Sequence, residues 1–520
     1  MNRIIISETD VTSNELTNIG SDIVYIPGFA IGGTQAVRSP KLCTSISEFE
    51  NAFGESAPRF IADQLYPAKS GSIPGFDSAS IPVESGGTGV NIWYNKGTKD
   101  PSYIYAKELI RAGLPVVYER INNVTQAPSF AVDPNGNLIE GFNIYSNLAT
   151  YAVNDYVIYN NAYYKCKTAI STPEEWTVAH WDAVDMTETP WFDVTVDRMY
   201  DAMMGNNLGT DETDIYNENV PGSLSEISTY NIKYITSGGY PTYGYSQTIG
   251  SGGEATTVEL QQKLATLAAS RGDAIAFIDH TNTPSRPLVG EGSVYNAVSS
   301  GMVSQATASF ATMITPWGIY DTSEASNVSM PGSFGYFLAL ARALRAYPSW
   351  LPVAGIVRGL IPALKGLNTN KQLTNAIADA YQTSPSESSG NISINAITWI
   401  NDQGYTIWGN RTATKFSDGF ATTFLNMRNL VCDVKKRAFK AAQTYMFEQN
   451  TDVLWVNFKS NIEGLLDQMV SGRAVDHYKI LRVATNDKTK IAAKIQIFPI
   501  YAVESFEISI ILTDEEITVE

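Results

Sequence analysis

Apolar and polar residues alternate over residues 397–409, and this period of two predicts two strands. The turn Asp402-Gln403-Gly404 separates them, and its glycine suits a tight connection. The apolar positions of the two strands are Ile397, Trp399, Tyr405 and Ile407. We therefore expect a β-hairpin here, followed by a change of period.

From about Ser417 to Phe447 the apolar residues recur every three or four positions, which predicts an amphipathic helix. Its apolar positions are Phe420, Phe424, Met427, Val431, Val434, Ala438, Ala441 and Tyr445. With 3.6 residues in each turn, Lys436, Arg437 and Lys440 fall on the opposite side. We expect that side to be a basic, outward surface, and the pattern contains no catalytic constellation.

Helices followed by strands recur along the rest of the chain, which predicts an α/β (α+β) fold with a mixed-sheet core. The expected pairs are 103–112 with 115–121, 260–270 with 274–279, and 294–304 with 310–314, and a further helix is expected at 334–346. A Ser cap with a Glu three residues later predicts a helix start within 45–55. Residues 67–100 are rich in Gly, Ser and Pro and are expected to form a loop. Its Gly86-Gly87 pair lacks the Lys-Ser/Thr of a phosphate-binding loop.

Both ends of the chain have a high propensity for β-structure. The first segment contains Ile4, Ile5 and Ile6, and in the last segment Phe506, Ile508 and Ile510 alternate with polar residues. Two further strands, 478–484 and 490–499, come before that last segment. We expect both ends to be extended β arms outside the compact body, where an unpaired strand seeks a neighbour.

Residues 143–185 differ in composition because aromatic residues are dense there. We expect strands at 156–159 and 162–168, joined by a tight turn at Asn160-Asn161, and a small all-β insertion as a result. The segment resembles the small chitin-binding-type carbohydrate module at Tyr151, Asp155, Val157, Tyr159, Tyr164, Cys166 and Trp181, with Asn154 and Asn161 where that family has glycine. The resemblance makes Trp176 and Trp181 candidates for glycan contact. The alternative is that these rings form the core of a very small domain.

The hairpin and helix of the C-terminal half also resemble those of contractile tail sheath proteins of myophages and related injection systems. The matching residues are Gly404, Trp408-Gly409, Arg411-Thr412, Arg428, Phe447-Glu448, Asn450 and Leu454-Trp455. Further matches are Glu48 to Gly54, Pro316-Trp317, Pro348-Ser349 and Ala354-Gly355, with one of the two prolines that the family has near position 348.

That resemblance implies a structural subunit of stacked rings in a helical sheath, which polymerises around an inner tail tube protein. The sheath shortens and drives the tube through the host envelope, leading to viral genome ejection. Baseplate and tail terminator proteins are the implied partners at its ends, and the implied location is the tail of the virion, with assembly in the host cytoplasm. Lys436, Arg437 and Lys440 then become candidate tube contacts.

The resemblance and the patterns together divide the chain into six parts. These are an N-terminal linking arm (1–24), a loop-rich first part of the body (25–142), the insertion (143–186), an α/β body (187–400), a C-terminal sheath domain (401–500) and a C-terminal linking arm (501–520).

Composition narrows the classes of function. A net charge of −17 argues against general nucleic-acid binding, which needs a basic face. Cys43, Cys166 and Cys432 are far apart and expected to be buried thiols, and the three histidines are isolated, so we expect neither a metal nor a cofactor. No apolar run is long enough to cross a membrane, and the first residues lack the apolar core of a signal peptide, so we expect the chain to begin as written.

Two other classes remain open from the residues alone. A glycoside hydrolase would need two carboxylates across a cleft, and Asp279 at the end of an expected strand is the one acidic residue in a suggestive place. A capping role for Asp279 in the next turn is the simpler interpretation. An adhesin would bind glycans without self-assembly. We expect no enzyme.

Overall fold

A computed structural model describes residues 22–62, 77–81, 90–120, 131–132, 138–139, 143–184, 224, 231–239, 259–279, 303–367, 393–414 and 421–502, except 32, 36–38, 57, 154, 160–161 and 305. The chain divides into two compact units. The first contains residues 1–349 and 353–433, and the second contains 350–352 and 434–520. Residues 1–21 and 503–520 of the predicted arms, with Ile4, Ile5, Ile6, Phe506, Ile508 and Ile510, lie outside the described residues, whereas Val24 at the end of the first arm belongs to the body.

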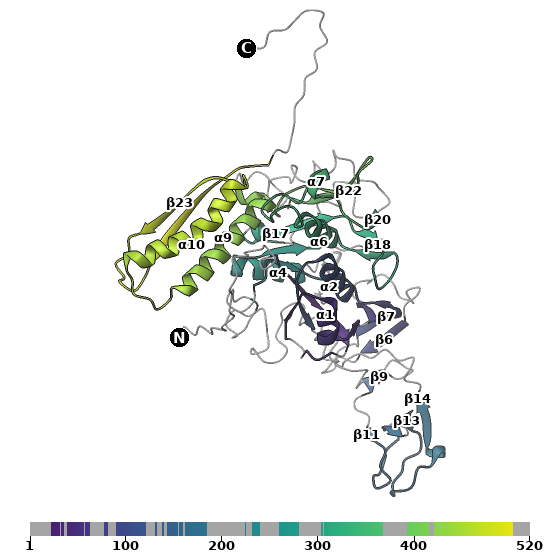
Figure 1. Cartoon of the computed structure of the whole chain (residues 1–520). Helices are drawn as coiled ribbons and strands as arrows, with labels where there is room; N and C mark the ends of the chain where they lie inside the picture. Colours follow the sequence, from purple (N-terminus) through teal and green to yellow (C-terminus); the bar gives the residue numbers. More distant parts are fainter. Residues whose placement is uncertain are drawn as a thin grey trace, which may run out of the picture. The chain divides into compact units, whose positions relative to one another are not determined.

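The centre of the first unit is an eight-stranded mixed sheet (Figure 1), ordered β22-β21-β17-β16-β15-β1-β8-β3. Its strands are β1 (Val24–Gly28), β3 (Lys41–Cys43), β8 (Val116–Arg120), β15 (Tyr234–Thr236), β16 (Ile275–Ile278), β17 (Ala311–Thr315), β21 (Asn395–Ile400) and β22 (Gly404–Trp408). The six inner strands run parallel, while β3 and β22 pair antiparallel at the two edges. The predicted α/β class and the hairpin at 397–409 are confirmed.

Helices cover the sheet, and its inner strands are buried. Every residue of β1, β8, β16 and β17 is buried, as in parallel sheets that are covered on both sides. The helices are α1 (Ile46–Phe53), α2 (Pro101–Ala112), α4 (Glu259–Arg271), α6 (Gly332–Ala343) and α7 (Gly355–Arg358), with 3-10 turns η5 (Ala308–Phe310) and η7 (Ala421–Thr423). Phe49, Tyr105 and Phe337 are among the fully buried rings of the core that these helices share with the sheet.

The helix starts follow their local sequences. Ser45 caps α1 by accepting a hydrogen bond from Glu48 N, while Glu48 Oε2 accepts one from Thr44 N at 3.0 Å. The Ser45 cap and the helix start expected within 45–55 are confirmed, while the Glu48 carboxylate accepts from Thr44 N, one residue before the cap, and so differs from the standard capping box. Asp100 caps α2 in the same way, accepting from Ser102 N at 2.9 Å and from Tyr103 N at 3.3 Å.

A buried ion cluster fixes three distant segments of the first unit. Lys233 is 0% exposed, and its Nζ lies 3.0 Å from Asp22 Oδ1 and 2.7 Å from Asp433 Oδ1. The same Nζ donates to Ser349 Oγ at 2.9 Å. Burial by itself would lower the pKa of Lys233, but the two carboxylates outweigh it and the pKa is raised. Asp433 lies on α9 (Leu425–Thr444), so the cluster anchors the start of that helix.

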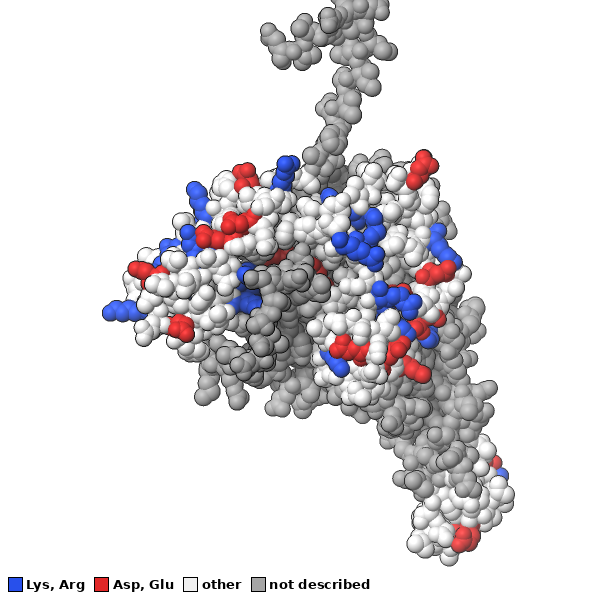
Figure 2. Space-filling view, viewed as in Figure 1, with Lys and Arg blue, Asp and Glu red and all other residues white. Residues whose placement is uncertain are grey.

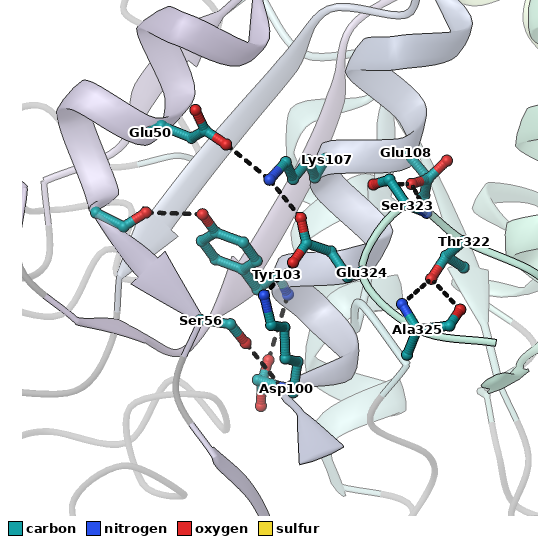
Figure 3. Close-up of polar contacts among 12 residues, drawn as sticks. Glu50, Ser56, Asp100, Tyr103, Lys107, Glu108, Thr322, Ser323, Glu324 and Ala325 are labelled. Atoms are coloured by element: carbon teal, nitrogen blue, oxygen red, sulfur yellow. Dashed lines mark hydrogen bonds and ion pairs between the residues drawn. The ribbon is translucent and has the colours of Figure 1, made fainter. Parts of the chain in front are cut away.

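A second polar network lies at the surface of the first unit (Figure 3). Lys107 on α2 pairs with Glu50 of α1 at 2.7 Å and also with Glu324, which lies in the turn before β19. Lys99 pairs with the same Glu324. The network therefore joins α1, α2 and that turn.

Residues 67–100 were expected to form a loop, and this expectation is wrong for the residues of this range that the structure describes, 77–81 and 90–100. β6 (Asp77–Ile81) and β7 (Val90–Lys99) form a three-stranded antiparallel sheet with β5 (Pro58–Ala62). Further small sheets are β2 (Ala30–Ile31) with β4 (Glu55–Ser56), β9 (Ala131–Val132) with β10 (Leu138–Ile139), and β18 (Gly318–Tyr320) with β19 (Val328–Met330) and β20 (Leu364–Leu367). The helix expected at 294–304 falls almost entirely outside the described residues.

The long helix α9 is shorter than the expected 417–447. Asn410 sets its start from a distance, since Leu425 N donates to Asn410 O at 3.0 Å and Asn426 N donates to Asn410 Oδ1 at 3.2 Å. It ends at Thr444, and Phe447 has a φ of 69° in the connection that follows. Then come α10 (Asp452–Ser471), β23 (Val475–Val483) and β24 (Ala492–Pro499).

The insertion contains a four-stranded sheet, described here by itself. Its strands are β11 (Asn143–Ile144), β12 (Tyr156–Tyr159), β13 (Ala162–Cys166) and β14 (Trp181–Val184), with a 3-10 turn η3 (Val178–His180). β12 and β13 pair antiparallel, which confirms the expected hairpin, and the turn Asn160-Asn161 lies outside the described residues.

Candidate assembly surface of the C-terminal unit

The second unit is built on one buried face of α10. Thr451 caps the helix by accepting from Leu454 N at 3.2 Å. Ile462, Leu466 and Met469 are buried and are spaced by four and three residues, so they lie on one side of the helix. The helix ends at Gly472, and Ala474 N then donates to Met469 O at 2.9 Å, which turns the chain into β23.

β23 and β24 form a long antiparallel ribbon with one face on α10. Tyr478 OH donates to Asp467 Oδ1 at 2.6 Å, and Arg482 Nη1 donates to Asp452 Oδ1 at 2.8 Å. Both acceptors belong to α10, and Ile480 between them on the same face is buried. Burial and the adjacent Asp467 carboxylate raise the pKa of Tyr478.

The opposite face of the ribbon is open and mixes apolar side chains with cations. Leu481 and Val483 are 47% and 44% exposed there, and Lys479 lies beside them in the alternation. Their cross-strand neighbours are Ala492, Lys494 and Gln496. At the end of the ribbon, His477 stacks on Phe498 with ring centroids 3.9 Å apart. The residues described on this face therefore include lysines, and none of them is acidic: Lys479, Leu481, Val483, Ala492, Lys494 and Gln496.

Both long edges of this ribbon lack a partner strand among the described residues, because β23 and β24 pair only with each other. An edge of eight or nine residues presents a row of backbone N–H and C=O groups, which can pair with another strand. A two-stranded hairpin is also marginal by itself and gains from further strands. The ribbon can therefore accept an extended segment by β-addition.

The three basic residues of the expected helix face differ in exposure. Lys440 is exposed, whereas Lys436 and Arg437 are half-buried. Arg437 Nε donates to Asn461 O at 3.1 Å and so connects α9 to α10. The expectation that all three side chains form one outward surface is thus wrong for Arg437, because part of its guanidinium is used inside the unit.

The two candidate glycan contacts lie in the aromatic core of the insertion. Trp181 is 2% exposed, which contradicts its role as a surface for a sugar ring. Trp176 is half-buried and stacks on Trp181 at 5.1 Å and on Tyr159 at 3.9 Å. Trp181 therefore behaves as the core residue of a very small domain, and glycan contact by Trp176 stays a prediction.

At the carboxyl ends of the central strands, where an α/β enzyme would bind a ligand, the space is filled by the chain itself. The strand order reverses between β1 and β15, and the carboxyl ends of such strands usually border a crevice. Here a Cβ added at Gly28 would lie 2.1 Å from Ser102 Oγ, so α2 packs directly against this point.

Asp279, the one suggestive carboxylate, is buried at the end of β16. Its Oδ2 accepts from Ser333 Oγ at 3.0 Å and from Ser237 Oγ at 3.3 Å, and burial raises its pKa to about 7. Ser333 lies in the first turn of α6, whose N-cap residue Pro331 provides no side-chain acceptor. Asp279 therefore supports the start of α6, and the turn after its own strand, which it was expected to cap, lies outside the described residues.

The cysteines and the remaining acidic and histidine side chains of the described part of the chain offer little for other chemistry. Cys43, Cys166 and Cys432 are free and buried, as expected. Within those residues no group of three or more His, Cys, Asp or Glu side chains could hold a metal ion. None of the helices described is both long and apolar enough to cross a membrane.

Comparisons with known proteins find similarity in sequence over part of the chain and in fold over nearly all of it. No family model matches the chain. The tail sheath protein of Vibrio phage KVP40 is 26% identical over 174 residues, which cover 32% of this chain and 24% of that relative. The matched region thus spans about a quarter of the relative's length.

Solved structures show a likeness over nearly the whole length. A chain in the cryo-EM structure of the anti-feeding prophage baseplate has a TM-score of 0.51 at 11% identity, covering 99% of both chains. This likeness shows that the two chains share a fold. A sheath tail protein of Desulfitobacterium hafniense gives a TM-score of 0.42 at 10% identity, covering 96% of this chain and 100% of that one. The second likeness is too weak to add support.

Proposed function

We propose that this chain is a structural subunit of a contractile tail sheath, which polymerises around an inner tube and contracts to drive that tube through the host envelope. The observation that carries the proposal is the 174-residue match to a phage tail sheath protein. The sheath-like motifs between Gly404 and Trp455 and the fold shared with a baseplate chain support it.

The ribbon of β23 and β24 is the proposed joint between copies. Each copy donates the outer parts of its arms, residues 1–21 and 503–520, to the open ribbon edges of other copies. A main-chain hydrogen bond contributes roughly 0.5–1.5 kcal/mol, so a few bonds in each arm hold subunits together. The arms then act as ties between copies, and the compact bodies can change their packing while the mesh stays connected.

The work of contraction comes, in this proposal, from better packing of copies in the shortened lattice. The chain acts as a structural protein rather than as an enzyme. Lys440, with Lys436 and the remaining donors of Arg437, faces an acidic inner tube protein. Baseplate and tail terminator proteins bind the two ends of the sheath, which belongs to the virion tail and assembles in the host cytoplasm.

Imaging of the purified full-length chain by negative-stain electron microscopy tests the proposal. We expect stacked rings or tubular polymers, and no release of sugar from chitin or peptidoglycan in parallel assays. Sugar release without polymers would favour the glycoside hydrolase alternative. Binding to glycans without polymers would favour an adhesin, and either result would contradict the proposal.

A further inference from the structure

Three arginines and three exposed apolar side chains gather where α6 ends and α7 begins. We call this set the arginine patch: Arg342, Arg345, Tyr347, Ile356, Val357 and Arg358. Ile356 and Val357 are 48% and 55% exposed, and Tyr347 is 37% exposed. Figure 2 shows Lys and Arg side chains gathered over the region of α6 and α7.

The arginine patch is preorganised. Arg342 Nη2 donates to Val357 O at 2.8 Å, which fixes the end of α6 against α7. The guanidinium of Arg358 lies over the ring of Tyr347, with its carbon 5.5 Å from the ring centroid. Neither Arg342 nor Arg345 makes an ion pair with a described carboxylate. Fixed arginines lose less freedom on binding than free side chains would.

Stabilisation of the C-terminus of α6 does not fully explain why arginines and exposed apolar side chains occur together in the arginine patch. Arginines near a helix C-terminus interact favourably with its dipole, and this accounts for Arg342 and Arg345. It does not account for two adjacent aliphatic side chains that are half exposed beside a tyrosine. Arginine and tyrosine are enriched at the energetically important centres of interfaces, and apolar neighbours exclude water there.

An acidic counterpart lies on the same unit. We call it the α1 acidic patch: Glu48, Glu50 and Glu55. Glu50 has a side chain that is 46% exposed, and it keeps this exposure while pairing with Lys107 (Figure 3). Leu42, on the strand before α1, adds an exposed apolar side chain. Asp and Glu side chains gather over α1 in Figure 2.

We propose that the arginine patch of one copy binds the α1 acidic patch of a second copy. The inference rests on the proposed function, which supplies the second copy. A chain with a net charge of −17 repels its own copies at long range, so a local attraction between opposite charges is needed to bring them together in one register. The apolar side chains of the arginine patch and beside the α1 acidic patch add buried contact area, while the opposite charges set the orientation of the two copies.

Sedimentation velocity and negative-stain microscopy of full-length proteins test this contact. The proteins are the wild type, Arg345→Glu with Arg358→Glu, Glu50→Lys with Glu55→Lys, and the variant with all four changes. Each double variant should weaken self-association about tenfold or more, because like charges then face each other. The fourfold variant should recover most of that loss, because the pairing is restored with its signs exchanged.

Two controls separate the contact from folding. Lys165→Glu with Lys167→Glu, in the insertion, makes the same change of net charge as Arg345→Glu with Arg358→Glu. It should leave self-association unchanged. Glu50→Gln with Glu55→Gln removes the acidic charges without placing a lysine beside Lys107, and it should weaken association less than the lysine variant. All variants should keep the thermal unfolding transition of the wild type within a few degrees.

The outcomes of the two proposals differ. Tubes that form equally well from both double variants would overturn this inference and leave the proposed function standing. Closed dimers that the fourfold variant restores, without tubes, would support the contact and contradict the sheath. A wild type that stays monomeric at every concentration would overturn both.

Discussion

Lys233 shows how a single buried residue can hold together segments that are remote in sequence. It lies 211 positions from Asp22 and contacts that carboxylate together with Asp433 and Ser349. A lysine before an apolar strand carries no sequence signal of such partners, and the cluster was not predicted. Only the parallel arrangement of β1 and β15 brings their preceding residues together.

Replacement of this lysine should be costly. In Lys233→Met the two carboxylates would remain buried without a cation, and the free energy of unfolding should fall by about 3–5 kcal/mol. Denaturant unfolding measures the loss. The matched change Lys459→Met, on the exposed side of α10, should alter stability by about 0.5 kcal/mol or less. Equal stability of both variants would show that the cluster does not anchor these segments.

The buried carboxyl of Asp279 should make stability depend on pH. Its pKa rises from 3.8 to about 7 on folding, so the folded chain binds the proton more tightly than the unfolded chain. Stability should therefore fall as pH rises from about 4 to about 7 and then level off. In Asp279→Asn this part of the pH dependence should disappear, with a gain on the order of a few kcal/mol above pH 7. An unchanged slope of unfolding free energy against pH would contradict this account.

The role of Trp176 and Trp181 in the insertion could not be predicted from residue type alone. A dense aromatic segment is compatible with a sugar-binding surface and with a small core, because both use the same side chains. The four-stranded sheet buries Trp181 and leaves Trp176 half exposed, and the difference depends on packing that spans 143–184. The buried cysteines were easier to predict, since isolated thiols are usually buried.

At the scale of elements, local patterns predicted most helices and strands of the core. The local sequence pattern gave wrong predictions where contacts with residues outside the segment determine its secondary structure. The sheet of β5, β7 and β6 was missed because Gly, Ser and Pro usually indicate loops, whereas β7 pairs with β6 just before it and with the more distant β5. The start of α9 was misplaced because Asn410, outside the helix, caps it.

The buried face of α10 should determine the stability of the second unit. Leu466→Ala removes a fully buried side chain and should cost about 2–5 kcal/mol. Val456→Ala, at a position that is 58% exposed on the same helix, should cost about 0.5 kcal/mol or less. Hydrogen exchange resolved along the chain should show faster exchange in α10 and β23 for the first variant alone. Similar exchange in both variants would contradict the assignment of the buried face.

The cationic residues of α9 should matter for assembly around the tube. Lys436→Glu with Lys440→Glu reverses two charges and leaves Arg437 bonded to Asn461. We expect folded protein whose assembly on purified inner tubes is reduced about tenfold or more. Lys488→Glu, in the loop between β23 and β24, serves as a control for charge reversal elsewhere in the unit. Normal tube-templated sheaths from the double variant would refute the contact.

At the scale of the molecule, the account depends on an open ribbon that is completed by other copies. The alternation of apolar and polar residues at both ends of the chain predicts strands that pair outside their own subunit. β23 and β24 provide two long edges that are unpaired among the described residues. Neither observation alone indicates polymerisation. Together with the match to a tail sheath protein, they support the proposal of a subunit that joins its neighbours through exchanged strands.

The most direct test of that claim is electron microscopy of chains that lack residues 1–21 or 503–520. A full-length variant with Ile4, Ile5 and Ile6 replaced by serine controls for chain length. The account predicts monomers with the thermal unfolding transition of the wild type and no cylinders in any of these three variants, beside cylinders from the wild type. Cylinders of normal length from the truncated chains would contradict it.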